Sequence, residues 1–158
     1  MNTIRNFVNK TLEVITVSLL SFMVVLGVWQ IITRYVFNNP SVLTEELLLV
    51  SFVWMGLLGM AYVFGKQEHM RMGFFADRFN PKVQHILRLI TEVVVLIFAS
   101  LVLVWGGMNI VSLGMGQISP ALGISMGYIY LALPIGGLLT VFYTIANIVD
   151  IFKGKESK

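Results

Sequence analysis

Three ionisable side chains flank a short polar turn between two long apolar runs. Arg34 closes the first run, and Glu45 and Glu46 follow the turn at residues 38–41. A charge beside a long apolar segment is costly to leave unpaired, so we expect Arg34 to pair with one of the two carboxylates. Two interpretations remain open: the three charges staple a helical hairpin at the edge of its apolar part, or they contact a partner protein.

The two histidines are the residues that could hold a haem, as in the membrane anchors of redox enzymes. His69 and His85 lie in a polar segment rather than inside an apolar run, so we interpret them as solvated loop residues. Glu92 and Arg88 stand four residues apart and predict an ion pair near the end of a helix. The chain has no cysteine. No carboxylate pair, nucleophile with a base, or phosphate-binding loop can be assembled from the motifs.

The sequence therefore predicts a protein that is not an enzyme and that has no catalytic residue, cofactor or metal ion. A membrane anchor subunit of a redox enzyme is the alternative, and it would need histidines inside the apolar runs. An independent small channel is a third interpretation, which would need a polar stripe along several runs.

The composition points to a membrane protein. Of the 158 residues, 57% are hydrophobic and 12% are charged, and the mean hydropathy is +0.85. Average soluble domains carry about twice that share of charged residues. The net charge of +3 is small and its Lys and Arg residues are scattered, so nucleic acid is not an expected partner.

Four apolar runs are long enough to cross a bilayer as helices. They cover about residues 11–33, 42–65, 86–110 and 128–152, and a spanning helix needs about 20 residues. The first run is longer than the apolar part of a signal peptide and has no small-residue cleavage site after it, so we expect it to be retained. We therefore predict an all-α integral membrane protein whose residues 1–158 form one membrane domain.

Aromatic residues and a proline mark the ends of these runs. Trp29 and Tyr35 lie at the end of the first, and Tyr128 and Tyr130 open the fourth. Amphipathic rings at such positions are typical of anchors in the membrane–water interface. Pro134 lacks a backbone donor and predicts a bend in the fourth helix.

The polar segment between the second and third runs contains an amphipathic stretch at about residues 70–80. Met72, Phe75 and Phe79 recur there at helical spacing, with charged residues between them. This pattern predicts a short helix on the membrane surface, with Phe75 and Phe79 as further interfacial anchors.

The basic residues predict the orientation. Of the eleven Lys and Arg residues, ten fall at the two termini and in the segment between the second and third runs, and only Arg34 falls on the other side. The positive-inside rule then places both termini of this multi-pass protein in the cytoplasm of a bacterium, with the chain in the inner membrane.

Several motifs together resemble one family. They are the segment Trp29-Gln30-Ile31-Ile32-Thr33-Arg34-Tyr35-Val36-Phe37-Asn38, then Glu45-Glu46-Leu47, His69-Met70-Arg71-Met72, and Leu133-Pro134-Ile135-Gly136. This set is similar to the small membrane subunit of TRAP transporters, the DctQ family, and it spans nearly the whole chain.

The resemblance implies a scaffold with four helices. In that family the small subunit pairs with a large membrane subunit that carries a sodium-coupled substrate path, and a periplasmic binding protein delivers an organic acid such as a C4-dicarboxylate or sialic acid. Arg34, Glu45 and Glu46 match the charges of the family's outer loop, and Gln30, one turn before Arg34, is expected to bond to another helix. Leu43 and Gly73 depart from the family, where a tryptophan and an aspartate are common.

Overall fold

The computed structural model describes residues 2–66 and 81–152, and every regular element within these two ranges is a helix. The expected surface helix at residues 70–80, with Phe75 and Phe79, lies outside the described residues, as does His69. The expectation of an all-α membrane protein is confirmed.

Within residues 2–66 and 81–152, four helical segments are long and apolar enough to cross a membrane. The first two are α1 (Asn2–Tyr35) and α2 (Val42–Lys66). The third runs through α4 (Pro81–Phe98), the π-helical segment η2 (Ala99–Gly106) and α5 (Gly107–Gly114). The fourth runs through α6 (Met126–Tyr130) and α7 (Ala132–Phe152). The helix α1 starts well before the predicted span, and the third segment continues beyond it to Gly114.

The turn between α1 and α2 forms where the polar cluster predicted it. Asn38 adopts a φ of 47°, a left-handed conformation that asparagine tolerates better than most residues. The hydroxyl of Ser41 accepts a hydrogen bond from the backbone N–H of Thr44 at 3.3 Å. This bond satisfies one of the free donors at the start of α2.

The fourth helix is interrupted at Leu131, between α6 and α7. Pro134, in the first turn of α7, has no N–H to donate to the carbonyl of Tyr130, and its ring crowds that carbonyl. The irregularity therefore falls on the turn that precedes the proline.

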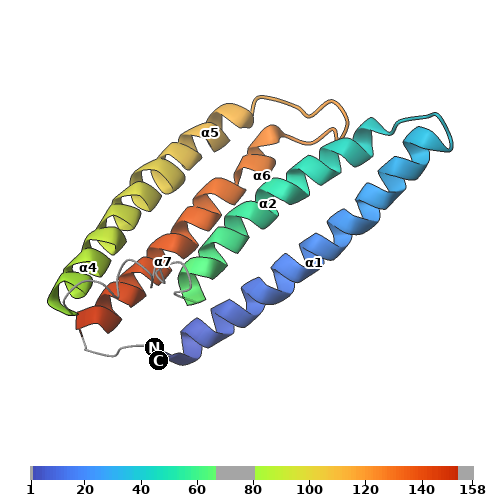
Figure 1. Ribbon diagram of the computed structural model, residues 1–158. Helices are drawn as coiled ribbons and strands as arrows, with labels where there is room; N and C mark the ends of the chain where they lie inside the picture. The colour runs from blue at the N-terminus through green and yellow to red at the C-terminus, as the bar shows by residue number, and fades with distance from the viewer. Residues whose placement is uncertain (1, 67–80, 153–158) are drawn as a thin grey trace.

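The four segments lie side by side in one layer (Figure 1). The helix α1 packs mainly against α2, α2 against α7, and α7 against the combined α4, η2 and α5 helix. The fourth helix in the sequence thus takes an interior place in the row. The described part of the chain has few buried apolar side chains, and a central cluster of them is Leu12, Leu58 and Tyr143.

Two adjacent glycines let α7 approach both of its neighbours. A Cβ added at Gly136 would lie 3.2 Å from the Cβ of Leu57 on α2, and one added at Gly137 would lie 2.7 Å from the Cβ of Leu103 on η2. Small residues are the usual means by which membrane helices come this close. The third membrane segment also has a glycine that faces α7. A Cβ added at Gly107 would lie 3.1 Å from Pro134.

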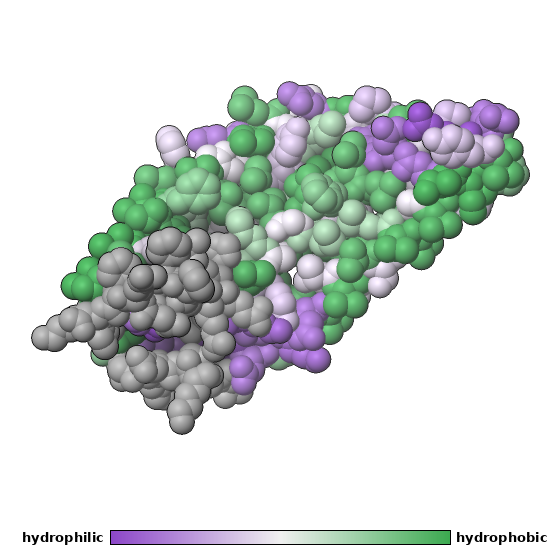
Figure 2. Space-filling view, in the orientation of Figure 1, coloured by the Kyte–Doolittle hydropathy of each residue, from purple (hydrophilic) through white to green (hydrophobic). Residues whose placement is uncertain are grey.

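The surface is mainly apolar along the helices. Figure 2 shows hydrophobic residues over the length of the row and hydrophilic residues gathered toward its two ends. We call these ends the terminal end, where α1 begins and α7 finishes, and the loop end, which carries the turn at residues 36–41 and the loop at residues 115–125.

Candidate functional site: polar clusters at the two ends of the helix row

An ion pair joins the first and last helices at the terminal end. The Nη1 of Arg5 lies 3.2 Å from the Oδ2 of Asp150, and the side chains are largely buried. The Nε of Arg5 donates to the carbonyl of Gly65 at 3.0 Å, and Nη2 donates to the same oxygen. One guanidinium therefore connects α1, α2 and α7, using the fork of donors that lysine lacks.

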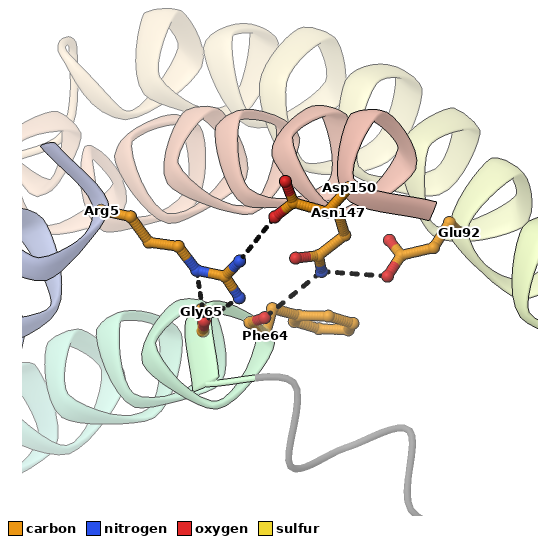
Figure 3. Close-up of polar contacts among 6 residues, drawn as sticks. All are labelled: Arg5, Phe64, Gly65, Glu92, Asn147 and Asp150. Atoms are coloured by element: carbon orange, nitrogen blue, oxygen red, sulfur yellow. Dashed lines mark hydrogen bonds and ion pairs between the residues drawn. The ribbon is translucent and has the colours of Figure 1, made fainter. Parts of the chain in front are cut away.

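A second set of bonds extends this connection to α4 (Figure 3). The Nδ2 of Asn147 donates to the Oε1 of Glu92 at 2.9 Å and to the carbonyl of Phe64 at 3.5 Å. Glu92 is only 2% exposed, and its other oxygen has no hydrogen-bond partner among the described residues. Burying a carboxylate costs free energy, and the hydrogen bond from the Asn147 amide offsets part of that cost.

The packing around Gly65 completes the terminal cluster, by which we mean Arg5, Asn9, Gly65, Glu92, Tyr143, Asn147 and Asp150. The hydroxyl of Tyr143 donates to the Oδ1 of Asn9 at 2.6 Å. A Cβ at Gly65 would lie 2.6 Å from that oxygen and 2.7 Å from the Cζ of Tyr143. All four membrane segments therefore meet at this end through polar bonds and a close glycine contact.

The ion pair that we expected between Arg88 and Glu92 is wrong. Glu92 is turned inward to Asn147, while Arg88 is exposed and has no ion-pair partner within residues 2–66 and 81–152. A pair four residues apart on a helix is worth only about 0.2–0.5 kcal/mol. A buried hydrogen bond between helices outweighs it.

At the loop end, Glu46 holds the loop at residues 115–125. Its Oε1 accepts a hydrogen bond from the hydroxyl of Ser119, and its Oε2 accepts one from the backbone N–H of Ala121 at 3.1 Å. The hydroxyl of Ser119 also accepts from the N–H of Leu122 at 3.0 Å. One carboxylate of α2 thus fixes a loop between α5 and α6.

The loop has a folded shape of its own. Backbone bonds join Ser119 N–H to Ile124 carbonyl at 2.9 Å and Met126 N–H to Gln117 carbonyl at 2.8 Å, around an isolated bridge between Ile118 and Ser125. Gly123 has a φ of +66°, which suits the turn because glycine has no Cβ.

The expected pairing of Arg34 with Glu45 or Glu46 is also wrong. Among the described residues, neither carboxylate lies within ion-pair distance of Arg34. Arg34 instead stands 6.0 Å from the centre of the Tyr35 ring, and both Arg34 and Glu45 are exposed. Glu46 is hydrogen-bonded to the loop at residues 115–125, so the two neighbouring glutamates have different environments.

The other residues singled out in the sequence have varied surroundings. Gln30 is half-buried on α1, and its side chain has no hydrogen bond in the described part of the chain. Trp29, Tyr35 and Tyr128 are exposed. Tyr130 is half-buried, and its ring lies so close to Gly114 that a Cβ there would be 2.7 Å from the Cδ2 of Tyr130.

Sequence reasoning did not identify the terminal cluster. The charge pattern counts Arg5 only among the basic residues of the cytoplasmic side, and no motif points to Tyr143 or Asn147. The available signal was the presence of polar side chains such as Asn147 and Glu92 inside apolar runs, which usually have partners on other helices.

Both clusters join elements and contain no arrangement for bond-making chemistry. No group of three His, Cys, Asp or Glu residues that could hold a metal ion occurs in the described ranges. What the two clusters can do is hold the helix row and its loop in one shape.

The comparisons with known proteins agree on one family. Residues 23–154 match the family described as tripartite ATP-independent periplasmic transporters, DctQ component. The chain is 31% identical over 153 residues to the sialic acid TRAP transporter small permease protein SiaQ of Vibrio cholerae serotype O1, covering 97% of this chain and 88% of the relative. It is 29% identical over 159 residues to a Haemophilus influenzae protein provisionally named a TRAP transporter small permease protein, covering 98% of each.

A further relative is much longer than this chain. The sialic acid TRAP transporter permease protein SiaT of Haemophilus influenzae is 29% identical over 140 residues, which are 85% of this chain and 22% of that protein.

Proposed function

Since this chain belongs to the DctQ family of tripartite ATP-independent periplasmic transporters, we propose that it is the non-catalytic small permease subunit of such a transporter. In this role it scaffolds the large membrane subunit and helps to dock the periplasmic binding protein. The transport that it supports is sodium-coupled uptake of an organic acid. Gln30, Arg34, Glu45 and Glu46 are its proposed assembly and partner contacts.

The observation that carries the scaffold role is the arrangement of the helices in a row. The most apolar stretch of α1 contains no buried residue, and apolar side chains are exposed along α4, η2 and α5 as well. A row leaves two broad apolar faces open, whereas a closed bundle would bury its interior. Such faces are suited to packing against another membrane protein.

Gln30 adds a half-buried polar group to α1, the edge helix of the row. An amide within an apolar helix that has no partner within residues 2–66 and 81–152 favours a hydrogen bond to a neighbouring helix of another subunit. The proposed neighbour is the large subunit. In the SiaT relative, the region similar to this chain makes up 22% of a longer permease protein. Such a relative supports a close association between this chain and a large permease.

The orientation is part of the proposal. The strong bias of Lys and Arg toward the terminal end supports a cytoplasmic location for both termini. The loop end, with Arg34, Glu45 and the loop at residues 115–125, then faces the periplasm, where a binding protein can reach it.

The proposed substrate class is an organic acid, with sialic acid ahead of C4-dicarboxylates. The support comes from the names of two relatives, SiaQ of Vibrio cholerae and SiaT of Haemophilus influenzae, which both specify sialic acid. The alternative of a redox-enzyme anchor has no support among these relatives.

Reconstitution into proteoliposomes tests the proposal. Vesicles that contain the large subunit and this chain, with binding protein and labelled sialic acid outside, should accumulate substrate only under an inward sodium gradient. Omitting this chain should abolish uptake, and this chain alone should transport nothing. Undiminished uptake in vesicles without the chain would refute the scaffold role, and uptake driven equally by potassium would refute sodium coupling.

A further inference from the structure

Glu45 and Glu46 are adjacent at the start of α2 but have different surroundings, so they have different roles in docking. Glu45 is exposed and its side chain has no hydrogen bond or ion pair within residues 2–66 and 81–152, whereas both oxygens of Glu46 accept hydrogen bonds from the loop. A carboxylate whose two oxygens are both bonded to the loop is held in place by it and cannot turn toward a partner protein without breaking those bonds. Glu46 therefore acts through the loop that it holds.

The loop itself has the properties of a contact surface. It contains no charged residue between positions 115 and 125, and Ile118 at its bridge is 72% exposed. Its shape is set by the bonds of Glu46 and by the hydroxyl of Ser125, which donates to the carbonyl of Gly114 at 3.1 Å. A preformed loop loses less conformational entropy on binding than a flexible one.

The position of the loop favours a soluble partner over lipid. Figure 1 shows the loop passing from the end of α5 toward the start of α2 and back to α6, beyond the ends of α5 and α6. Irregular backbone of this kind is not tolerated in contact with lipid tails. The loop presents the exposed apolar Ile118 next to the exposed polar Gln117, and protein interfaces combine apolar and polar contacts in this way.

We propose that the loop at residues 115–125 is the surface of this chain that contacts the periplasmic binding protein, and that Glu46 is a positioning residue that fixes the loop in its binding shape. This inference rests on the proposed function, because it requires that a binding protein docks at the loop end.

The first test compares two charge-neutralising variants on different helices. Glu46→Gln removes the acceptor for one of the two donors of the loop, and Glu13→Gln removes the same charge from the terminal half of α1, away from the loop. The complex of this chain with the large subunit is placed in nanodiscs, and its affinity for the purified cognate binding protein is measured. We expect E46Q to lower the affinity by about tenfold and E13Q to change it by less than about twofold.

Transport kinetics distinguish loop positioning from general damage. For E46Q, the concentration of binding protein that gives half-maximal uptake should rise, while the rate at saturating binding protein and the co-purification of the two membrane subunits should stay as in the wild type. A fall in the saturated rate, or an equal loss of affinity in E13Q, would overturn the proposal.

The second test reports directly on Ile118. Because the sequence has no cysteine, Ile118→Cys introduces a single thiol that can carry an environment-sensitive dye, and Lys10→Cys at the terminal end is the control. We expect the dye at position 118, and not the one at position 10, to shift to the blue when binding protein is added. If the dye at position 118 already emits at a blue-shifted wavelength in nanodiscs before binding protein is added, then lipid or the large subunit covers this position. That result would overturn the proposal.

The two proposals fail in different ways. If the wild-type complex does not bind the binding protein at all, the docking role is refuted and the loop assignment falls with it. If the wild type binds while E46Q and an Ile118→Ser variant bind equally well, only the loop assignment is refuted.

Discussion

Replacing Gly65 by alanine should separate the helices that meet at the terminal end. The added Cβ would lie 2.6 Å from the Oδ1 of Asn9 and 2.7 Å from the Cζ of Tyr143. Tyr143 is fully buried and bonded to Asn9, so neither atom can move away cheaply. Overpacking of this kind costs about 1–3 kcal/mol, and alanine returns about 0.5–1 kcal/mol in a helix interior. We expect a net loss of roughly 1–2 kcal/mol.

The matched control is another glycine of the same helix. A Cβ at Gly56 would meet no atom within 4 Å, so Gly56→Ala should be neutral or stabilising by about 0.5–1 kcal/mol. Unfolding of both variants in detergent micelles, by titration with sodium dodecyl sulfate and circular dichroism, gives the two free energies. If G65A proves as stable as G56A, the close contact of α2 with Tyr143 is not as described. A Tyr143→Leu background should reduce the cost of G65A, because the two sites are in contact.

Three further outcomes are expected. Arg5→Lys should lose about 1–2 kcal/mol in the same titration, because an ammonium cannot bond to Asp150 and to the Gly65 carbonyl with the same fork; wild-type stability would contradict this. Asn147→Leu should cost about 2–3 kcal/mol by leaving the buried Glu92 carboxylate without its amide donor, and the double variant with Glu92→Leu should recover most of that loss. For the orientation, a thiol at position 39 should react with a membrane-impermeant maleimide added to spheroplasts, while one at position 10 should react only after permeabilisation, and the reverse pattern would invert the proposed topology.

The helices could be predicted from the sequence because the thickness of a bilayer dictates the length of an apolar run. The turn before α2 could also be predicted, since Asn38 and Pro40 disfavour a continuous helix. The end of the third helix is less well predicted, because the sequence places it at about residue 110, whereas the helix continues to Gly114. In the structure, Gly107 continues the helix and gives Pro134 room to approach.

The partners of the charged residues could not be predicted from spacing along the chain. Arg34 was assigned to Glu45 or Glu46 because they flank the same turn, but Glu46 bonds to Ser119, which is 73 residues away. Glu92 was assigned to Arg88 by helical spacing, but it bonds to Asn147, 55 residues away. Hydropathy shows that a segment crosses the membrane and contains no information on which segment lies next to it.

The interior place of α7 in the row has a consequence for how the protein is made. Helices enter the membrane in the order of synthesis, so α1, α2 and the α4–η2–α5 helix are all inserted before α7 leaves the ribosome. The second and third membrane helices therefore spend part of biogenesis without the helix that separates them and that each of them packs against. The fourth membrane segment completes the row, and a chain that stops before this segment has its gap in the interior rather than at an edge.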